Sequence, residues 1–220
     1  MNHTRLLNTY LVVAAIYLVG LIAFSESFNF TTKPLLLPWL LMAVYIFPTI
    51  RNRTWLFGAL LFSWIGDILL LFVYKSQTFF IFGLVSFLIA HLAYILAFKN
   101  EIKGYHPKKS LPYFYIILII GYLLAMWFVL IPTLGGMKIP VILYSIVITT
   151  MLAMSIYVDS ILDSAASKWM ILGAILFVLS DSILAFNKFH SPVPFASLAI
   201  MSTYLFAQFA LVKGFLQKWS

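Results

Sequence analysis

Two aspartates lie inside strongly apolar segments, and their type and position make them the first candidates for chemistry. Asp67 falls in residues 58–70, GALLFSWIGDILL, and Asp181 falls in residues 173–185, GAILFVLSDSILA. When the Gly-Ala pairs that open the two segments are aligned and one residue is deleted, the two aspartates coincide. A carboxylate near the centre of a bilayer costs about 2.5–3.5 kcal/mol even on lenient insertion scales, so such a residue is a functional-site hypothesis by default.

Two carboxyl groups close together in a dry site cannot easily both ionise, because burial and like charge both disfavour the second charge. One protonated and one ionised carboxyl is the usual arrangement for acid/base work on an ether-type bond. The alternative is structural, with each aspartate bonding a hydroxyl or amide and only holding helices together. Small residues on the same helical faces would allow close packing in either case; they are Ala59, Ser63, Gly66, Gly173, Ala174, Ser180 and Ala185.

The composition is that of a polytopic membrane protein. The 220 residues are 64% hydrophobic and only 9% charged, with a mean hydropathy of +1.05, whereas soluble domains carry roughly 25% charged residues. The lipid bilayer is therefore an expected partner, and the net charge of +8 is interpreted as a topology signal rather than as a nucleic-acid site. The absence of cysteine excludes disulfides, a thiol nucleophile and thiolate metal sites.

The apolar runs predict an all-α fold of eight transmembrane helices in a single domain, 1–220, each helix near the roughly 20 residues that a bilayer needs. The expected spans are 7–24, 34–50, 54–74, 79–98, 111–131, 139–158, 168–187 and 195–216. Residues 25–33 and 159–167 are expected to be polar loops. The first run is taken as a span rather than a removed leader, because no clear small-x-small cleavage site follows it.

Basic residues are distributed unequally between the two sides of these spans. If the N-terminus is cytoplasmic, that side holds ten of the 14 Lys and Arg residues: Arg5, Arg51, Arg53, Lys99, Lys103, Lys108, Lys109, Lys168, Lys213 and Lys218. The other side holds Lys33, Lys75, Lys138 and Lys188. This bias fits the positive-inside rule with both termini cytoplasmic. We expect an integral, multi-pass protein of a bacterial-type cytoplasmic membrane.

A weak internal repeat relates two four-helix halves, about 1–104 and 105–220. Beyond the two aspartate segments, Lys33-Pro34 near the second span matches Lys138-Ile139-Pro140 near the sixth. The pair His91 and Tyr94 in the fourth span matches Tyr204 and Gln208 in the eighth. Halves of four spans share one orientation and are related by an axis along the membrane normal. The alternative is chance similarity between apolar segments.

Four lysines lie on the side toward which both aspartate helices run. Lys75 and Lys188 follow the aspartates by about two helical turns, on the order of 11 Å, and Lys33 and Lys138 flank other spans. Together they predict a cationic rim for a phosphate headgroup. The alternative is ordinary snorkelling of lysines at helix ends.

Further polar residues within the spans have two interpretations that stay open. His91, expected in the inward half, is either a satisfied structural histidine or a member of the site, and a zinc site with both aspartates is conceivable but not implied. Tyr144, Tyr204 and Gln208 either line a cavity or form interhelical hydrogen bonds worth about 0.6 kcal/mol each. Serine hydrolysis has no support, because no G-x-S-x-G motif is present.

Several of these residues form motifs, namely Phe62-Ser63-x-x-Gly66-Asp67, His91-x-x-Tyr94, Gly173-Ala174-x-x-Phe177-x-x-Ser180-Asp181 and Tyr204-x-x-x-Gln208. In these motifs the sequence resembles the YhhN family of membrane proteins, which includes the lysoplasmalogenases. The resemblance implies eight spans, two intramembrane aspartates and cleavage of the vinyl ether bond of a lysoplasmalogen to a fatty aldehyde and a glycerophospho-base. Many bacterial members are assigned by similarity alone.

The hypothesis is therefore a membrane hydrolase that acts on a lysophospholipid substrate with Asp67 and Asp181 as catalytic residues, without a cofactor or metal. The predicted substrate-binding residues are Lys33, Ser63, His91, Tyr94, Tyr144, Ser180, Lys188, Tyr204 and Gln208. The alternatives are a small-molecule or proton-coupled transporter, which would also suit paired carboxylates in repeated halves, and a non-catalytic lipid-binding protein. The sequence does not distinguish acid from base, and it predicts no headgroup, chain length or oligomeric state.

Overall fold

The computed structural model describes residues 3–23, 26–47, 53–106 and 113–219, and its elements are all helical. In chain order they are α1 His3–Ala23, α2 Glu26–Thr32, the 3-10 helix η1 Lys33–Leu35, α3 Pro38–Ile46, α4 Arg53–Leu71, α5 Gln77–Glu101, α6 Tyr113–Leu130, the 3-10 helices η2 Ile131–Thr133 and η3 Gly135–Met137, α7 Lys138–Leu162, α8 Ala165–Phe189 and α9 Ala196–Trp219. Seven helices of this described part are long and apolar enough to cross a membrane: α1 and α4 to α9. The prediction of an all-α, polytopic membrane protein is confirmed.

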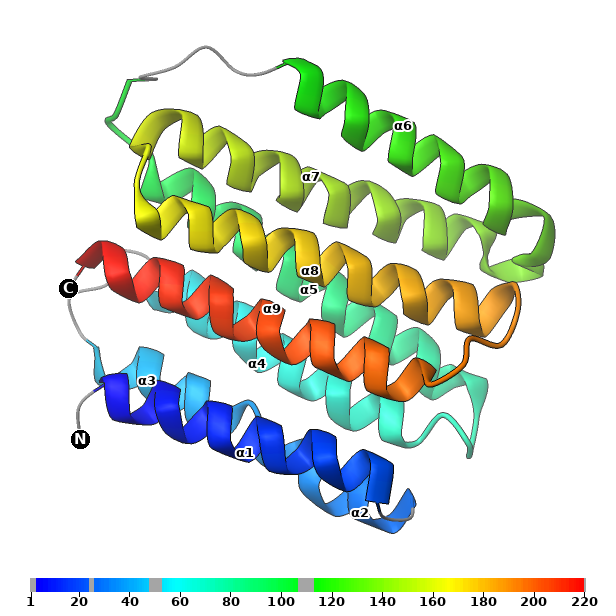
Figure 1. The fold of residues 1–220 in the computed structure, drawn as a ribbon. Coiled ribbons are helices and arrows are strands. Elements are labelled where there is room, and N and C mark those ends of the chain that lie inside the picture. The colour runs from blue at the N-terminus through cyan, green and yellow to red at the C-terminus, as the bar shows by residue number, and fades with distance from the viewer. Residues whose placement is uncertain (1–2, 24–25, 48–52, 107–112, 220) are drawn as a thin grey trace.

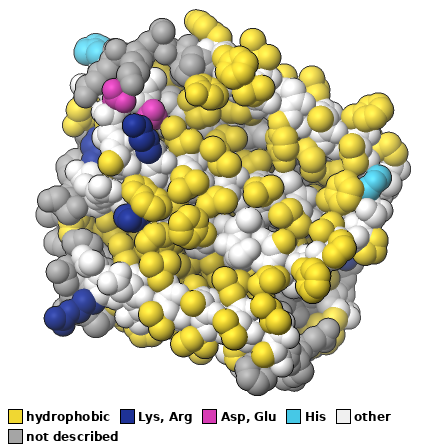
Figure 2. Space-filling view, viewed as in Figure 1, with side chains coloured by type: hydrophobic (Ala, Val, Ile, Leu, Met, Phe, Trp, Pro, Cys, Tyr) yellow, Lys and Arg dark blue, Asp and Glu magenta, His cyan; other side chains and the backbone are white. Residues whose placement is uncertain are grey.

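The long helices lie side by side along one direction (Figure 1). α4, α5, α8 and α9 form the middle of the bundle, α1 to α3 cover one side, and α6 lies at the opposite edge. α1 begins at the same end at which α9 finishes; the other end, where α2 lies, is called the α2 end below. Apolar side chains cover most of the face seen in Figure 2, and Lys and Arg gather mainly away from the α2 end.

The prediction of a continuous second span over 34–50 is wrong as far as the structure describes it. Residues 26–46 instead hold three short helices, α2, η1 and α3. Residues 26–32, expected in a loop, are therefore helical. Pro34 lies at the start of η1 and Pro38 at the start of α3; each lacks an N–H and interrupts the hydrogen-bond ladder. The segment runs back from the α2 end as a broken helix (Figure 1). Residues 48–52 lie outside the described residues.

The other seven predicted spans correspond to long helices with different bounds. α7 and α8 are longer than predicted, so the expected loop 159–167 shrinks to a sharp turn. Asp163 adopts the left-handed conformation with φ 43° and ends α7. Ser164 and Ser167 then form a reciprocal capping box that starts α8. Local capping chemistry therefore sets this boundary, which apolar length alone does not reveal.

Glycines let neighbouring helices approach closely in the centre of the bundle. A Cβ at Gly173 of α8 would lie 2.8 Å from the backbone nitrogen of Leu211 and 2.9 Å from the carbonyl oxygen of Ala207, both on α9. A Cβ at Gly66 of α4 would lie 2.7 Å from the ring of Phe87 on α5. Such close approach is how helices pack without a hydrophobic driving force between them. It fixes α4 and α8, the two helices that carry the aspartates, against α5 and α9.

We expect Gly173→Ala to destabilise the protein by about 1–3 kcal/mol, because the new methyl group meets the α9 backbone, which cannot move aside like a side chain. The matched control is Gly121→Ala in α6, where a Cβ would meet nothing within 4 Å, so that variant should be neutral or slightly stabilised. Unfolding in mixed micelles measures both. Equal stabilities of the two variants would contradict the packing described here.

Candidate active site

Asp67 and Asp181 line one cavity of about 400 Å³ near the α2 end of the bundle. We call it the aspartate chamber. α1, α2, η1, α4, α8 and α9 all contribute polar side chains to it: Tyr17, Asn29, Lys33, Asp67, Ser180, Asp181, Asn187, Lys188, Ser197 and Tyr204. Two carboxyl groups that are far apart in the sequence therefore face the same partly polar space.

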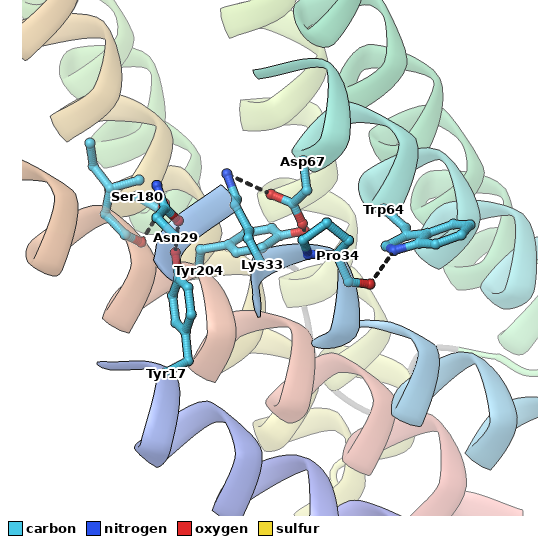
Figure 3. Close-up of polar contacts among 9 residues, drawn as sticks. Tyr17, Asn29, Lys33, Pro34, Trp64, Asp67, Ser180 and Tyr204 are labelled. Carbon is cyan, nitrogen blue, oxygen red and sulfur yellow. Dashed lines mark hydrogen bonds and ion pairs between the residues drawn. The ribbon is translucent and has the colours of Figure 1, made fainter. Parts of the chain in front are cut away.

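Asp67 is buried and bound on both sides. Its Oδ1 lies 3.2 Å from the ammonium of Lys33, and its Oδ2 accepts a hydrogen bond of 2.6 Å from the hydroxyl of Tyr204 (Figure 3). Lys33 is the first residue of η1, in the broken segment. The indole of Trp64 on α4 donates to the carbonyl oxygen of Pro34 at 2.7 Å and ties η1 to the aspartate helix. The break in the second segment therefore brings a cation to Asp67.

Asp181 has different partners. Its Oδ2 accepts a hydrogen bond from the hydroxyl of Tyr144 on α7, and it lies 3.9 Å from Nε2 of His91 on α5. Among the described residues no lysine or arginine lies within ion-pair distance of it. Its side chain is 15% exposed, and it also lines two smaller, mainly apolar cavities outside the chamber. One aspartate is thus neutralised by a cation, and the other lies where a polar chamber meets apolar space.

His91 belongs with Asp181 rather than with Asp67. Its ring is fully buried and lies edge-on to Phe177, at 4.6 Å between centroids, and to Tyr144, at 5.3 Å. Neither ring nitrogen has a hydrogen-bond partner among the described residues. Expected in the inward half of its helix, His91 nevertheless reaches one carboxylate. Within the described part of the chain, no three His, Asp or Glu side chains come together as a metal-ligand group.

Several predicted substrate-binding residues contact protein rather than the chamber. The hydroxyl of Tyr94 donates to Oε1 of Gln208 at 2.5 Å; both are buried, join α5 to α9 and lie outside the chamber lining. Ser63 is buried and also lies outside the lining. Ser180 lines the chamber but donates its hydroxyl to the carbonyl oxygen of Ile200 at 3.0 Å. Gln208 thus makes an interhelical hydrogen bond, with Tyr94 as its partner.

The predicted rim of four lysines is wrong as a ring. Lys33 bonds Asp67 inside the chamber, and Lys188 lies on the lining with its ammonium 5.4 Å from the centroid of the Phe80 ring. Lys75 and Lys138 are exposed and do not line the chamber. Lys75 instead lies 5.1 Å from the ring centroid of Phe72.

Sequence reasoning missed four polar residues of the chamber, Tyr17, Asn29, Asn187 and Ser197. The hydroxyl of Tyr17 donates to Oδ1 of Asn29 at 2.7 Å, and Oδ1 of Asn187 accepts from the backbone nitrogen of Val193 at 2.9 Å. Asn29 falls in residues 25–33, which the sequence pattern predicts to be a loop rather than part of the bundle. Asn187 lies beside Lys188 at the polar end of an apolar helix, and this position is the sequence feature that could have marked it as a chamber residue.

The contacts of the two aspartates follow the predicted repeat, which itself stays a prediction. The segment before each aspartate helix supplies one partner, Lys33 for Asp67 and Tyr144 for Asp181. The last helix of the opposite half supplies the other, Tyr204 for Asp67 and His91 for Asp181. Two halves related by an axis between them would produce this exchange. The partners differ in chemistry, so the two carboxyl groups are not equivalent.

Comparison with known proteins agrees with these motifs. The model of the YhhN family matches residues 28–215. The chain belongs to the YhhN family. Lysoplasmalogenase TMEM86B of Mus musculus is 34% identical over 73% of this chain and 63% of its own length. Lysoplasmalogenase TMEM86B of Homo sapiens is 30% identical over 93% of this chain and 83% of its own length.

The lysoplasmalogenase of Mycobacterium bovis is 29% identical over 76% of this chain and 62% of its own length. The chain thus spans a little less than two thirds of the mouse and mycobacterial relatives that it matches. No solved structure matches the chain. Family membership is shown by sequence, and the geometry of the site comes from this structure.

The Lys33–Asp67 pair gives a test of the chamber. Lys33→Met should destabilise the protein by about 3–5 kcal/mol, because it leaves a buried carboxylate without its cation. Adding Asp67→Asn should restore part of that loss, since the double variant has no charge to compensate. Lys75→Met, at an exposed lysine, is the control and should be nearly neutral. If the losses of unfolding free energy in Lys33→Met and Asp67→Asn simply add in the double variant, the two groups do not interact.

Proposed function

We propose that the protein is a membrane hydrolase that cleaves the vinyl ether bond of a lysoplasmalogen-type lysophospholipid, giving a fatty aldehyde and a glycerophospho-base. One observation carries the proposal: two carboxyl groups with different partners face one chamber, which meets apolar space at Asp181. The names of the family relatives supply the reaction. The chamber supplies residues of the type that this reaction needs.

The partners suggest which carboxyl is the acid. Asp67 contacts the ammonium of Lys33 and accepts from Tyr204, and both contacts favour a carboxylate. Asp181 has only a tyrosine hydroxyl and His91 beside it. Because two like charges that face one chamber disfavour each other, we assign the proton to Asp181. Asp181 is then the proton donor, and Asp67 is the carboxylate that stabilises positive charge and orients water.

The reaction then follows in balanced steps. Asp181 gives its proton to the vinyl carbon remote from the ether oxygen, and the other vinyl carbon and the oxygen share the positive charge of an oxocarbenium ion. Water adds to that carbon while its proton passes to Asp67, which leaves a hemiacetal. The hemiacetal loses its hydroxyl proton as the glycerol oxygen gains one, and aldehyde and alcohol separate. Proton transfer from Asp67 to Asp181 restores the site, with one water consumed.

Depth along α8 suits this substrate. Lys188 and Asn187 lie at the end of the helix, and Asp181 lies about 10 Å deeper at 1.5 Å per residue. A headgroup phosphate near Lys188 and Asn29 would place the glycerol and its ether oxygen close to the aspartates. With both termini cytoplasmic, as the charge bias favours, the α2 end is the external one, and substrate would come from the external leaflet.

A small-molecule or proton-coupled carrier is the second candidate, and the broken segment α2–η1–α3 favours it. Discontinuous helices that place polar groups at membrane depth are typical of transporters, and Lys33 lies at such a break. Against a carrier, α4 and α8 run without interruption through both aspartates. The described cavity that holds both aspartates also lies toward one end of the bundle, whereas carrier sites lie near the midplane.

The test is aldehyde release by the purified protein from vinyl-ether lysophosphatidylethanolamine and lysophosphatidylcholine. We expect release by the wild type and a loss of about 10²–10⁴-fold in Asp67→Asn and in Asp181→Asn. Asp159→Asn is the matched control: this carboxylate accepts a hydrogen bond from Ser167 at 2.6 Å and lies outside the chamber, so its activity should remain.

Each alternative result has a distinct meaning. If folded wild-type protein releases no aldehyde from either lysophospholipid, the proposed substrate is excluded and the carrier becomes the favoured function. Proton-driven flux in proteoliposomes would then test the carrier. Aldehyde release that survives Asp67→Asn or Asp181→Asn would support the reaction but contradict the two-carboxylate mechanism.

A further inference from the structure

α6 is the least embedded of the long helices. It lies at the edge of the bundle (Figure 1), and Leu130, at its last position, is its only buried residue. That end is held in a small cluster with Phe80, Met137 and Val141. Over the rest of its length the contact with α7 and α8 is incomplete, and two cavities lie between the helices.

These two cavities lead from a catalytic carboxyl to the outside of the bundle. The inner one, of about 60 Å³, is lined by Asp181, Tyr144 and Trp127 among others. The outer one, of about 290 Å³, is lined by Leu118, Ile119 and Tyr122 of α6, by Leu152 of α7 and by Ile175, Val178 and Leu179 of α8. Tyr122 and Val178 line both, so the cavities adjoin. We call the outer cavity the α6–α8 groove.

We propose that the α6–α8 groove binds the hydrocarbon chain of the lysolipid whose ether bond reacts at Asp181. This inference rests on the proposed function for the identity of the lipid, but the groove and its apolar lining do not depend on the reaction. The occupant is a single saturated or monounsaturated chain. A tunnel for a polar molecule would need polar partners along its wall, and the Tyr122 hydroxyl is the one polar side-chain group on this lining.

The order of groups along α8 matches the order of groups in a lysolipid. From the α2 end inward the helix presents Lys188, then Asp181, then Val178 and Ile175. Ile175 lies about 9 Å deeper than Asp181 at 1.5 Å per residue. A lipid with its phosphate near Lys188 and its ether at Asp181 therefore has its chain pointing toward the bilayer centre, where the groove lies.

Tyr122 stands between the two cavities. Its hydroxyl is hydrogen-bonded to Ser182 of α8, one residue after the catalytic aspartate. Chain and tyrosine cannot occupy this constriction together, so the bond between α6 and α8 must open, or the ring must turn, when the first chain carbons enter. Tyr122 is therefore a positioning residue that separates the reacting end of the substrate from lipid.

The first test uses chain length. Leu118→Trp puts an indole at the groove, and we expect it to lower the rate ratio of hexadecenyl over octenyl lysoplasmalogen by about tenfold, the discrimination that a shaped apolar pocket gives. Leu124→Trp is the matched control on the same helix: Leu118 is 51% exposed and Leu124 54%, but Leu124 lines neither cavity. An unchanged ratio in folded Leu118→Trp, or equal changes in both variants, would overturn the proposal.

A second test does not need hydrolysis. A trace of non-cleavable hexadecyl lysophosphatidylethanolamine with a diazirine at mid-chain is photolysed with the wild type in nanodiscs. We expect crosslinks on α6 and α8 that excess unlabelled hexadecyl lysolipid removes and diacyl phospholipid does not. Labelling spread evenly over the lipid-facing helices, or placed at Leu70 and Leu84 in the other cavity beside Asp181, would overturn the chain site. Failure of aldehyde release with the expected labelling would refute the reaction and leave the chain site intact.

Discussion

A buried carboxylate within the apolar bundle needs a cation, and the ion pair between Asp67 and Lys33 meets that need. Several features of the fold serve this pair. The second segment breaks at its prolines so that η1 can bring Lys33 in. Trp64 binds the carbonyl oxygen of Pro34 and holds the break against α4. Unpaired, either charge would cost several kcal/mol at this depth, so this local geometry is the constraint that the chamber depends on.

The same pair makes the two halves of the site unequal. Asp67 contacts a lysine and a tyrosine, whereas Asp181 contacts a tyrosine and a histidine. Only one set contains a fixed cation. Repeated halves commonly serve symmetric tasks such as alternating access, whereas hydrolysis of an ether needs two carboxyl groups in different protonation states.

The sequence predicts the parts of this structure that follow from local pattern. Apolar length identifies the seven long helices, and the apolar context of Asp67 and Asp181 marks them as candidates for one site. Their contacts with Tyr204 and Tyr144 involve residues that were also singled out, although pattern alone left their role open.

What the sequence does not predict depends on contacts between distant segments. The apolar run after Pro34 is long enough for a span, and the sequence does not show that a break at Pro34 and Pro38 brings Lys33 to Asp67. Lys33 and Lys138 look alike in the sequence, yet one is buried against Asp67 and the other is exposed. The approach of His91 to Asp181 depends on how α5 crosses α8, which its own periodicity does not encode.

In the proposed mechanism, Lys33 holds Asp67 as a carboxylate while Asp181 carries the proton. Infrared difference spectroscopy of the purified protein at neutral pH tests this without any substrate, through the C=O stretching band of a protonated carboxylic acid. The wild type should show this band, and Asp181→Asn should lose it. A band that disappears in Asp67→Asn and persists in Asp181→Asn would contradict the assignment of acid and carboxylate.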